Sequence, residues 1–186
     1  MMGRGHMITG VCALEHAYVA SILIDRVDIM PLTVLKDAAG TYLGIPGMSP
    51  FIIPVCLGAY LLGNLLPDID DPKSLLGRVI HVPVRHRTWL HAIYLYLLVA
   101  ALGFVHPVFS WMFFGIFVHL FWDSFSAMGN CWFYKLFSDY REYPNGARVK
   151  KGHKLKLYHA GCWSEYLLLF IIVAATMVSF IWIRRL

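Results

Sequence analysis

The fold class is decided by a stretch near the carboxyl end of the chain that reads YLLLFIIVAATMVSFIWI from Tyr166 to Ile183. It contains no charged residue. A helix needs about 20 predominantly apolar residues to cross the roughly 30 Å of hydrocarbon in a bilayer. Together with Glu165, which precedes it, this stretch is therefore predicted to be a membrane-spanning helix.

The remainder of the chain is also unusually apolar. Of its 186 residues, 59% are hydrophobic and 15% are charged, and the mean hydropathy is +0.62, so a bilayer rather than water is the expected solvent. Four further apolar segments are predicted to enter the membrane, namely residues 6–24, 49–66, 89–106 and 107–125. The sequence therefore predicts an all-α, polytopic membrane helix bundle with about five membrane segments, forming one domain over residues 1–186.

The first of these segments is interrupted at its middle by Glu15 and His16. A charged side chain at the centre of a bilayer costs about 2.5–3.5 kcal/mol on insertion scales. We therefore expect both side chains to face other helices rather than lipid. A partly re-entrant first segment is the alternative.

If the five segments alternate in direction, one membrane face receives the amino terminus, residues 67–88 and residues 126–164. This face, called face A below, carries 12 of the 16 Lys and Arg residues. Cytoplasmic loops are enriched in Lys and Arg, so we predict a protein of the bacterial inner or plasma membrane with face A in the cytoplasm. Basic residues beside a membrane normally meet anionic headgroups. Membrane lipids, and not nucleic acids, are thus the expected partners of the basic 126–164 loop.

The residues suited to chemistry gather at face A, at the ends of different apolar segments. They are His6, Asp68, Asp70, His86, Arg87, His91, His119, Asp123 and Glu165. Chance would scatter such side chains over both faces, so a shared site is indicated. Imidazoles and carboxylates are ligands of zinc, and a carboxylate-rich set also suits manganese or iron. We therefore predict a metal centre at this face.

Each part of this pattern has a simpler interpretation. His119 and Asp123 are four residues apart on a predicted helix and so point the same way, as two metal ligands or as an ordinary hydrogen-bonded pair. Asp68 and Asp70 share one side of an extended or turn segment, or they cap a helix. Residues 86 and 91 need not share a face, so one His can be a ligand and the other a proton-transfer group.

Four blocks, taken together, resemble the YdjM family of inner-membrane proteins, which are described as metal-dependent hydrolases. They are Gly5-His6, Leu66-Pro67-Asp68-Ile69-Asp70 with Pro72 and Ser74, His86-Arg87 with His91, and Gly115-x-x-x-His119-x-x-x-Asp123. The resemblance covers roughly residues 6–130, with a weaker echo at Gly161-x-x-x-Glu165. A more distant similarity, to zinc phospholipase C and its nuclease relatives, rests on the His119-x-x-x-Asp123 pair and the order of ligand types.

The resemblance implies a set of metal ligands and one to three bound ions, with zinc the first choice and manganese or iron the alternatives. The set comprises His6, His16, Asp68, Asp70, His86, His91, His119, Asp123 and Glu165, of which His6 and His16 are competing candidates for the amino-terminal ligand. The chain departs from the family pattern at Asp71, where the family commonly has His. It departs again at Leu90 and Ala92, where two hydroxyl side chains are lost.

The function implied is a membrane-bound metal-dependent hydrolase that cleaves an ester or phosphoester of a lipid-linked substrate with metal-activated water. Asp68, Asp70 or His91 would accept the proton, and Arg87 would bind an anionic oxygen of the substrate. A non-catalytic metal-binding, transport or regulatory membrane protein is the alternative. Transport would require a polar path to the opposite face, and few groups beyond Glu15, His16 and Asn64 offer one.

Overall fold

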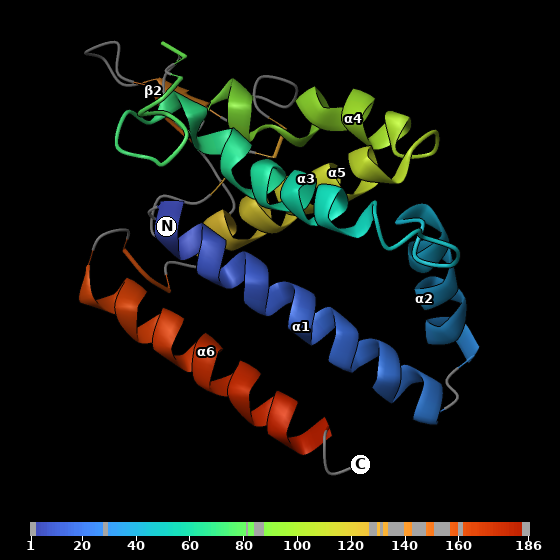
Figure 1. Cartoon of the computed structure of the whole chain (residues 1–186). Coiled ribbons are helices and arrows are strands. Elements are labelled where there is room, and N and C mark those ends of the chain that lie inside the picture. The colour runs from blue at the N-terminus through green and yellow to red at the C-terminus, as the bar shows by residue number, and fades with distance from the viewer. Residues whose placement is uncertain are drawn as a thin grey trace.

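Helices account for most of the computed structural model (Figure 1). It describes residues 3–27, 30–80, 82–83, 88–126, 130, 132–133, 140–142, 148–150, 157–159 and 162–183. The α-helices in this part of the chain are α1 (Gly3–Val27), α2 (Met30–Tyr42), α3 (Ile53–Leu65), α4 (Leu97–Leu102), α5 (Pro107–Ser124) and α6 (Trp163–Ile183). Three 3-10 turns, η1 (Leu66–Asp70), η2 (Trp89–His91) and η3 (Ile93–Tyr96), lie between them, and β1 (Tyr140–Glu142) pairs antiparallel with β2 (Arg148–Lys150).

Helices α1 and α6 are the two, among the described residues, that are long and apolar enough to cross a membrane. Their spans cover Gly5–Val27 and Trp163–Trp182, and at 1.5 Å per residue helices of this length reach about 30 Å or more. Only 6% of the α6 span is buried within the molecule. A helix that is apolar all round and almost wholly exposed suits lipid rather than water. The predicted carboxyl-terminal membrane helix is therefore present.

The other three predicted segments are not among these candidate spans. Helix α3 has 13 residues, which is about 20 Å, because Pro54 fixes its first turn and Pro67 ends it. The segment 89–106 is divided into η2, η3 and the six-residue α4. Helix α5, with 18 residues, turns a buried polar face toward the interior. The part of the chain that the structure describes thus contains two candidate spans, and the count of about five membrane segments stays a prediction.

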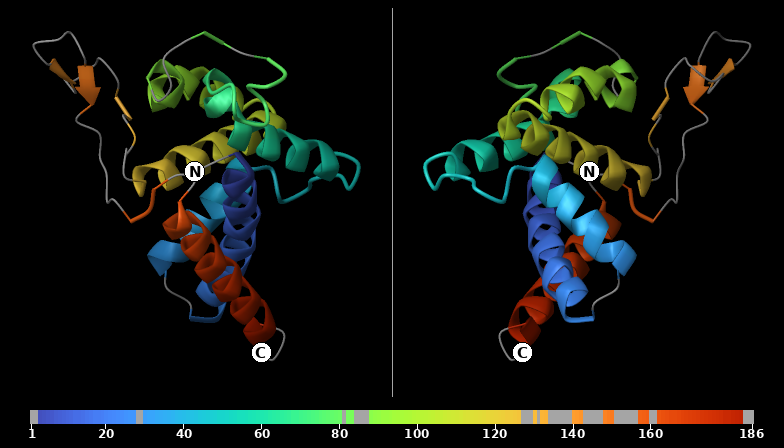
Figure 2. Two further views of the ribbon diagram at one scale, coloured as in Figure 1. Left: turned by 90° about the vertical axis from the view of Figure 1, so that its left-hand side faces the viewer. Right: turned by 90° about the vertical axis from the view of Figure 1, so that its right-hand side faces the viewer.

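The helices form two layers (Figures 1 and 2). Helices α1 and α6 run side by side in the same direction, and α2, which the sequence left as a connection within 25–48, packs on α1. Helices α3, α4 and α5 form the second layer and run obliquely across the amino-terminal half of α1. Helices α3 and α5 make the most extensive contact between any two elements described. The start of α1 therefore lies close to the carboxyl ends of α3 and α5.

Glycines allow α3 and α5 to approach closely. A Cβ atom added at Gly115 would lie 2.1 Å from the carbonyl oxygen of Tyr60, and one added at Gly63 would lie 2.1 Å from that of Met112. Neither position therefore admits a side chain without movement of the neighbouring backbone. The contact brings the carboxyl ends of both helices, where Asp68 and His119 lie, to one place.

Glu15 and His16, the polar residues at the middle of α1, are only partly buried by other helices. The Ser179 hydroxyl of α6 donates to Glu15 at 2.9 Å, so Glu15 faces another helix as expected. The side chain of His16 is 45% exposed but lines a cavity between α1, α5 and α6, so it too faces other helices. Its Nδ1 lies 2.7 Å from the carbonyl oxygen of Cys12, which is a local contact within α1. Helix α1 is continuous through this point, so it is not re-entrant.

Candidate metal centre

Five imidazole and carboxylate side chains converge at the centre of the molecule. They are His6 from the start of α1, Asp68 from η1, His91 from η2, and His119 and Asp123 from α5. The three imidazoles and the Asp123 carboxylate have no exposed surface, and the Asp68 carboxylate is 5% exposed. Segments more than 100 residues apart in the chain thus contribute to one buried polar cluster.

One ligand atom from each of four residues, His6, Asp68, His119 and Asp123, lies within 4.8 Å of all the others. The His6 Nε2 atom is 3.4 Å from Asp123 Oδ1 and 4.0 Å from Asp68 Oδ2. The His119 Nε2 atom is 3.5 Å from Asp68 Oδ1 and 3.8 Å from Asp123 Oδ2. Two atoms bound tetrahedrally to one zinc ion at 2.0–2.2 Å lie about 3.3–3.6 Å apart. The spacing therefore suits ligands of a shared ion.

His91 joins the same cluster at the carboxylate oxygens that also face His119. Its Nε2 atom is 3.5 Å from Asp68 Oδ1 and 3.3 Å from Asp123 Oδ2. The rings of His91 and His119 meet edge to face with centroids 5.5 Å apart, and the rings of His6 and His119 stack at 3.7 Å. The donor set is thus three imidazoles and two carboxylates.

Hydrogen bonds orient His119 toward the cluster. Its Nδ1 atom lies 2.7 Å from the carbonyl oxygen of Asn64, at the end of α3. A ring that donates from Nδ1 to a carbonyl carries its lone pair on Nε2, the arrangement common for metal-bound His. Among the described residues, neither His119 Nε2 nor either ring nitrogen of His6 has a hydrogen-bond partner, although all three are buried. A metal ion accounts for buried nitrogen atoms of this kind.

The backbone around Asp68 is held by the break that Pro67 makes after α3. The chain continues as η1, and the Ser74 hydroxyl donates to the carbonyl oxygen of Asp68 at 2.7 Å. Burial by itself raises the pKa of Asp68, but the charges and hydrogen bonds of His119, His91 and His6 together outweigh it and hold the pKa well below its usual value. Asp68 is therefore a carboxylate, which is the form that binds a cation.

Comparison with known proteins places the chain in a family. A family model described as YdjM inner membrane protein matches residues 1–186. The chain belongs to the YdjM family. No curated protein and no solved structure matches it. The resemblance seen over residues 6–130 thus extends over the whole chain, and the family description agrees with the two apolar helices in placing the protein in a membrane.

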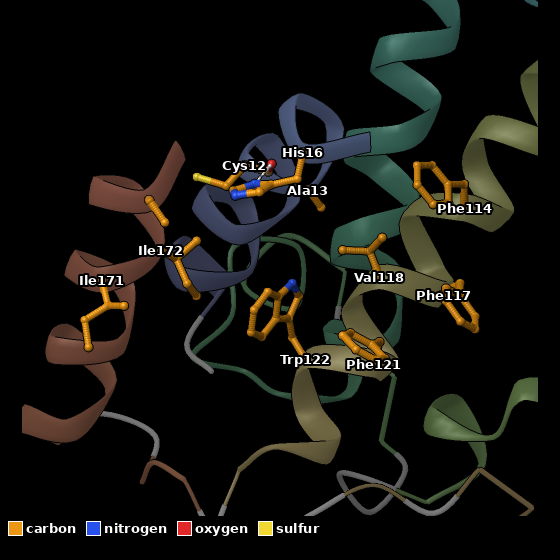
Figure 3. Close-up of a pocket in the computed structure, with 11 residues that line it drawn as sticks. Cys12, Ala13, His16, Phe114, Phe117, Val118, Phe121, Trp122, Ile171 and Ile172 are labelled. Carbon is orange, nitrogen blue, oxygen red and sulfur yellow. Dashed lines mark hydrogen bonds between the residues drawn. The ribbon is translucent and has the colours of Figure 1, made fainter. Parts of the chain in front are cut away.

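Of the two candidates for the amino-terminal ligand in this YdjM protein, His6 lies in the cluster and His16 does not. His16 is ten residues further along α1 and lines an apolar cavity of about 450 Å³ between α1, α5 and α6 (Figure 3). Figure 3 shows its ring beside Cys12, with Ile172 of α6 and Trp122 of α5 across the cavity. The expectation that His16 is a metal ligand is therefore corrected in favour of His6.

The remaining predicted residues lie outside the group of four. Asp70 is buried in η1, two residues from Asp68, and Glu165 is buried at the start of α6, but neither belongs to that group. His86 and Arg87 lie outside the described residues.

Asn64 is the residue of the site whose role the sequence did not predict. Its carbonyl oxygen accepts from His119, and its side-chain Nδ2 donates to the carbonyl oxygen of His6 at 3.1 Å. It thus joins the two helices that carry these ligands. The available signal was an amide within an otherwise apolar helix, since a buried polar side chain there is costly without partners.

Proposed function

We propose that this protein is a membrane-bound metal-dependent hydrolase whose metal centre is built from His6, Asp68, His91, His119 and Asp123. The observation that carries the proposal is the convergence of three imidazoles and two carboxylates from separate elements, with ligand atoms 3.3–4.0 Å apart. Burial of so many polar groups is unfavourable unless a cation is shared among them.

The two carboxylates favour a pair of ions. On one side, Asp68 Oδ2 and Asp123 Oδ1 face His6. On the other side, Asp68 Oδ1 and Asp123 Oδ2 face both His91 and His119. Each carboxylate therefore presents one oxygen to each of two sets of nitrogen atoms, so Asp68 and Asp123 would help to hold both ions if a pair were bound. Zinc is the expected metal because the set mixes nitrogen and oxygen donors, with manganese or iron as alternatives.

The chemistry that bound metal supplies is a lowered pKa of water, which provides hydroxide near neutral pH. Among the residues of the chain, Asp70 lies two positions from Asp68 in η1 but outside the ligand group, so it is the residue that we assign to accept the proton. Arg87 keeps its charge at all physiological pH values and has a planar fork of donors suited to an anionic oxygen. We assign it to the substrate rather than to the metal, because a guanidinium and a divalent cation repel each other.

A lipid-linked ester or phosphoester is the substrate class that fits the fold. Helix α1 carries His6 near its start, and Gly5 of α1 and Glu165 of α6 line one pocket, so both membrane-length helices begin at the same end of the molecule. If both cross the bilayer, the centre lies close to the level at which lipid headgroups meet hydrocarbon. A soluble substrate would not require this placement.

A metal-binding protein without hydrolysis is the second candidate. The observation that favours it is the near-complete burial of all five ligand side chains, since a catalytic metal needs a position open to water and substrate. Hydrolysis requires access to the centre through movement of the segments around it.

Turnover measurements on the purified protein separate the two candidates. Metal-loaded protein in mixed micelles is tested on phosphoester and carboxyl-ester lipids, with the His119→Ala variant as the metal-deficient control. The hydrolase proposal predicts metal-dependent release of product from one of the two lipid classes, lost in His119→Ala. Full metal loading with no turnover above the His119→Ala background in either class would favour the non-catalytic candidate.

A further inference from the structure

A second cavity, of about 660 Å³, lies beside the metal centre between α1, α6 and residues 71–78. It is called the α1–α6 pocket here, and its lining includes Gly5, Ile8, Lys73, Arg78, Leu169 and Val173. Unlike the cavity in Figure 3, which is bordered almost entirely by apolar side chains, this one combines basic and apolar walls. A pocket of mixed character suggests an amphipathic ligand.

The basic wall comes from the segment that follows η1. Lys73 and Arg78 both line the pocket and are both exposed, so their side chains are accessible to a ligand there. Glu165 also lines the pocket but is only 2% exposed, so its side chain is more deeply buried than those of Lys73 and Arg78. The basic wall therefore favours an anion, and a phosphate group accepts hydrogen bonds from both kinds of cation.

The apolar wall comes from the two candidate membrane helices. Ile8 lies on α1, and Leu169, Phe170 and Val173 lie on α6. Phe170 is 70% exposed, so this wall continues into the apolar surface of α6. Helices α1 and α6 run side by side from this end of the molecule (Figure 1). A hydrocarbon chain lying along them would extend from the headgroup level into the bilayer.

Two residues that line the α1–α6 pocket are neighbours in sequence of residues in or next to the metal centre. Gly5 of its lining precedes His6, and Lys73 precedes Ser74, whose hydroxyl bonds to the carbonyl oxygen of Asp68. A ligand anion held by Lys73 would thus lie on the segment that positions a metal-binding carboxylate.

We propose that the α1–α6 pocket binds one anionic phospholipid, with its phosphate at Lys73 and Arg78 and one acyl chain between α1 and α6. The lipid belongs to the surrounding bilayer. Taking it as the substrate rests on the hydrolase function proposed above, whereas the binding itself does not.

Native mass spectrometry of the full, metal-loaded chain in detergent tests the binding. The protein is titrated with phosphatidylglycerol, with phosphatidylcholine and with glycerol 3-phosphate. One phosphatidylglycerol binds in preference to the other two. The Lys73→Gln/Arg78→Gln variant binds it roughly 10- to 30-fold more weakly, at about fivefold for each cation removed. Leu169→Trp, which fills the apolar end, weakens it as well.

Two matched controls keep the wild-type affinity. Arg26→Gln removes a cation from the last turn of α1, far from the pocket, and Val178→Trp enlarges an exposed residue of α6 that does not line it. Unchanged affinity in both pocket variants would overturn the proposal, as would an equal loss in Arg26→Gln. Equal binding of glycerol 3-phosphate and phosphatidylglycerol would also overturn it, in favour of a soluble phosphate. Because the readout is binding, a protein that holds the lipid but hydrolyses nothing would contradict only the hydrolase function.

Discussion

At the scale of single residues, the notable feature is how many titratable side chains lie together without exposed surface. The rings of His6 and His119 stack with centroids 3.7 Å apart while both face the same two carboxylates. Two adjacent imidazoles gain little from each other, and charging both would cost electrostatic repulsion at short range. A cation between nitrogen and carboxylate atoms removes this conflict, because neutral imidazoles and anionic carboxylates then bind it together.

Replacement of His6 and of His16 by alanine should have opposite outcomes. His6→Ala removes a buried nitrogen ligand and should lower the metal content by at least one equivalent, because a ligand position is lost. His16→Ala, on the same helix but with a half-exposed ring, should leave the metal content unchanged. Elemental analysis of both purified variants is the measurement. Loss of metal from His16→Ala but not from His6→Ala would exchange the roles of the two residues.

Arg87→Ala should separate chemistry from metal binding. The variant should keep the metal and the fold but hydrolyse its substrate about 10²–10³-fold more slowly, the usual consequence of deleting one donor to a transition-state anion. Metal content and kcat/KM are measured on the same preparation. Turnover at the wild-type rate would leave Arg87 as a headgroup-anchoring residue and remove it from the mechanism.

The sequence could predict most of this cluster because each ligand lies next to the end of an apolar segment. It could not decide between His6 and His16, since both occupy the same helix and only the packing of α3 and α5 determines which turn of α1 is covered. The role of Asn64 could not be predicted from the sequence for a related reason. Its backbone carbonyl does the orienting, and every residue has one.

At the scale of elements, the contact between α3 and α5 positions the ligands. Gly63 and Gly115 bring the two helices to backbone contact, and the Asn64 carbonyl then reaches His119 one turn beyond Gly115. Close approach through glycine is typical of helices in membranes, where van der Waals packing and hydrogen bonds replace the hydrophobic effect.

Gly115→Ala should therefore disturb both stability and the metal centre. The added methyl group would meet the Tyr60 carbonyl at 2.1 Å, which should cost roughly 1–3 kcal/mol through displacement of the helices. Gly58→Ala, in the same α3 layer with nothing within 4 Å of the added atom, is the control and should be neutral or stabilising by about 0.5–1 kcal/mol. Thermal unfolding in detergent and metal content are compared.

Equal behaviour of the two alanine variants would contradict the importance of this contact. If Gly115→Ala lowered the unfolding temperature but kept all of its metal, the contact would stabilise the fold without positioning His119.

Segment 89–106 illustrates why hydropathy alone does not determine where a helix is continuous. The chain turns at Ala92, which is extended with φ −94° and ψ 123°, and the Ile93 amide donates to the carbonyl of Trp132. This turn allows η2 to direct His91 into the cluster. Tyr96 of this segment is buried, but Leu97 and Leu98 of α4 are 58% and 70% exposed, so the breaks in the helix, and not burial, distinguish the segment from one continuous span.

At the scale of the whole molecule, the two layers meet where the ligands lie. Helix α1 begins at the ligand cluster, since it carries His6, and α6 runs beside α1 in the same direction. If both cross the bilayer, the cluster lies at one membrane face, and the excess of Lys and Arg in the segments at that face predicts that it is cytoplasmic.

Cysteine labelling tests this orientation. Cys162 is exposed and directly precedes α6, so a membrane-impermeant maleimide should label it in lysed cells but not in intact cells. The test uses a Cys131→Ser background, so that labelling reports Cys162. An Arg26→Cys variant with Cys162 and Cys131 replaced by serine should already be labelled in intact cells. Residue 26 lies in the last turn of α1, at the other end of that span. Labelling of Cys162 from outside intact cells would place the ligand cluster on the external face.

The metal content of the purified protein tests whether the buried His and Asp cluster is a metal centre. Elemental analysis of the wild-type protein should find about two equivalents of transition metal, zinc foremost, because Asp68 and Asp123 each face two sets of nitrogen atoms. The His119→Ala/Asp123→Ala double variant, confirmed as folded by its circular dichroism, should retain almost none. Wild-type metal content in that variant would contradict the claim that this buried cluster is a metal centre.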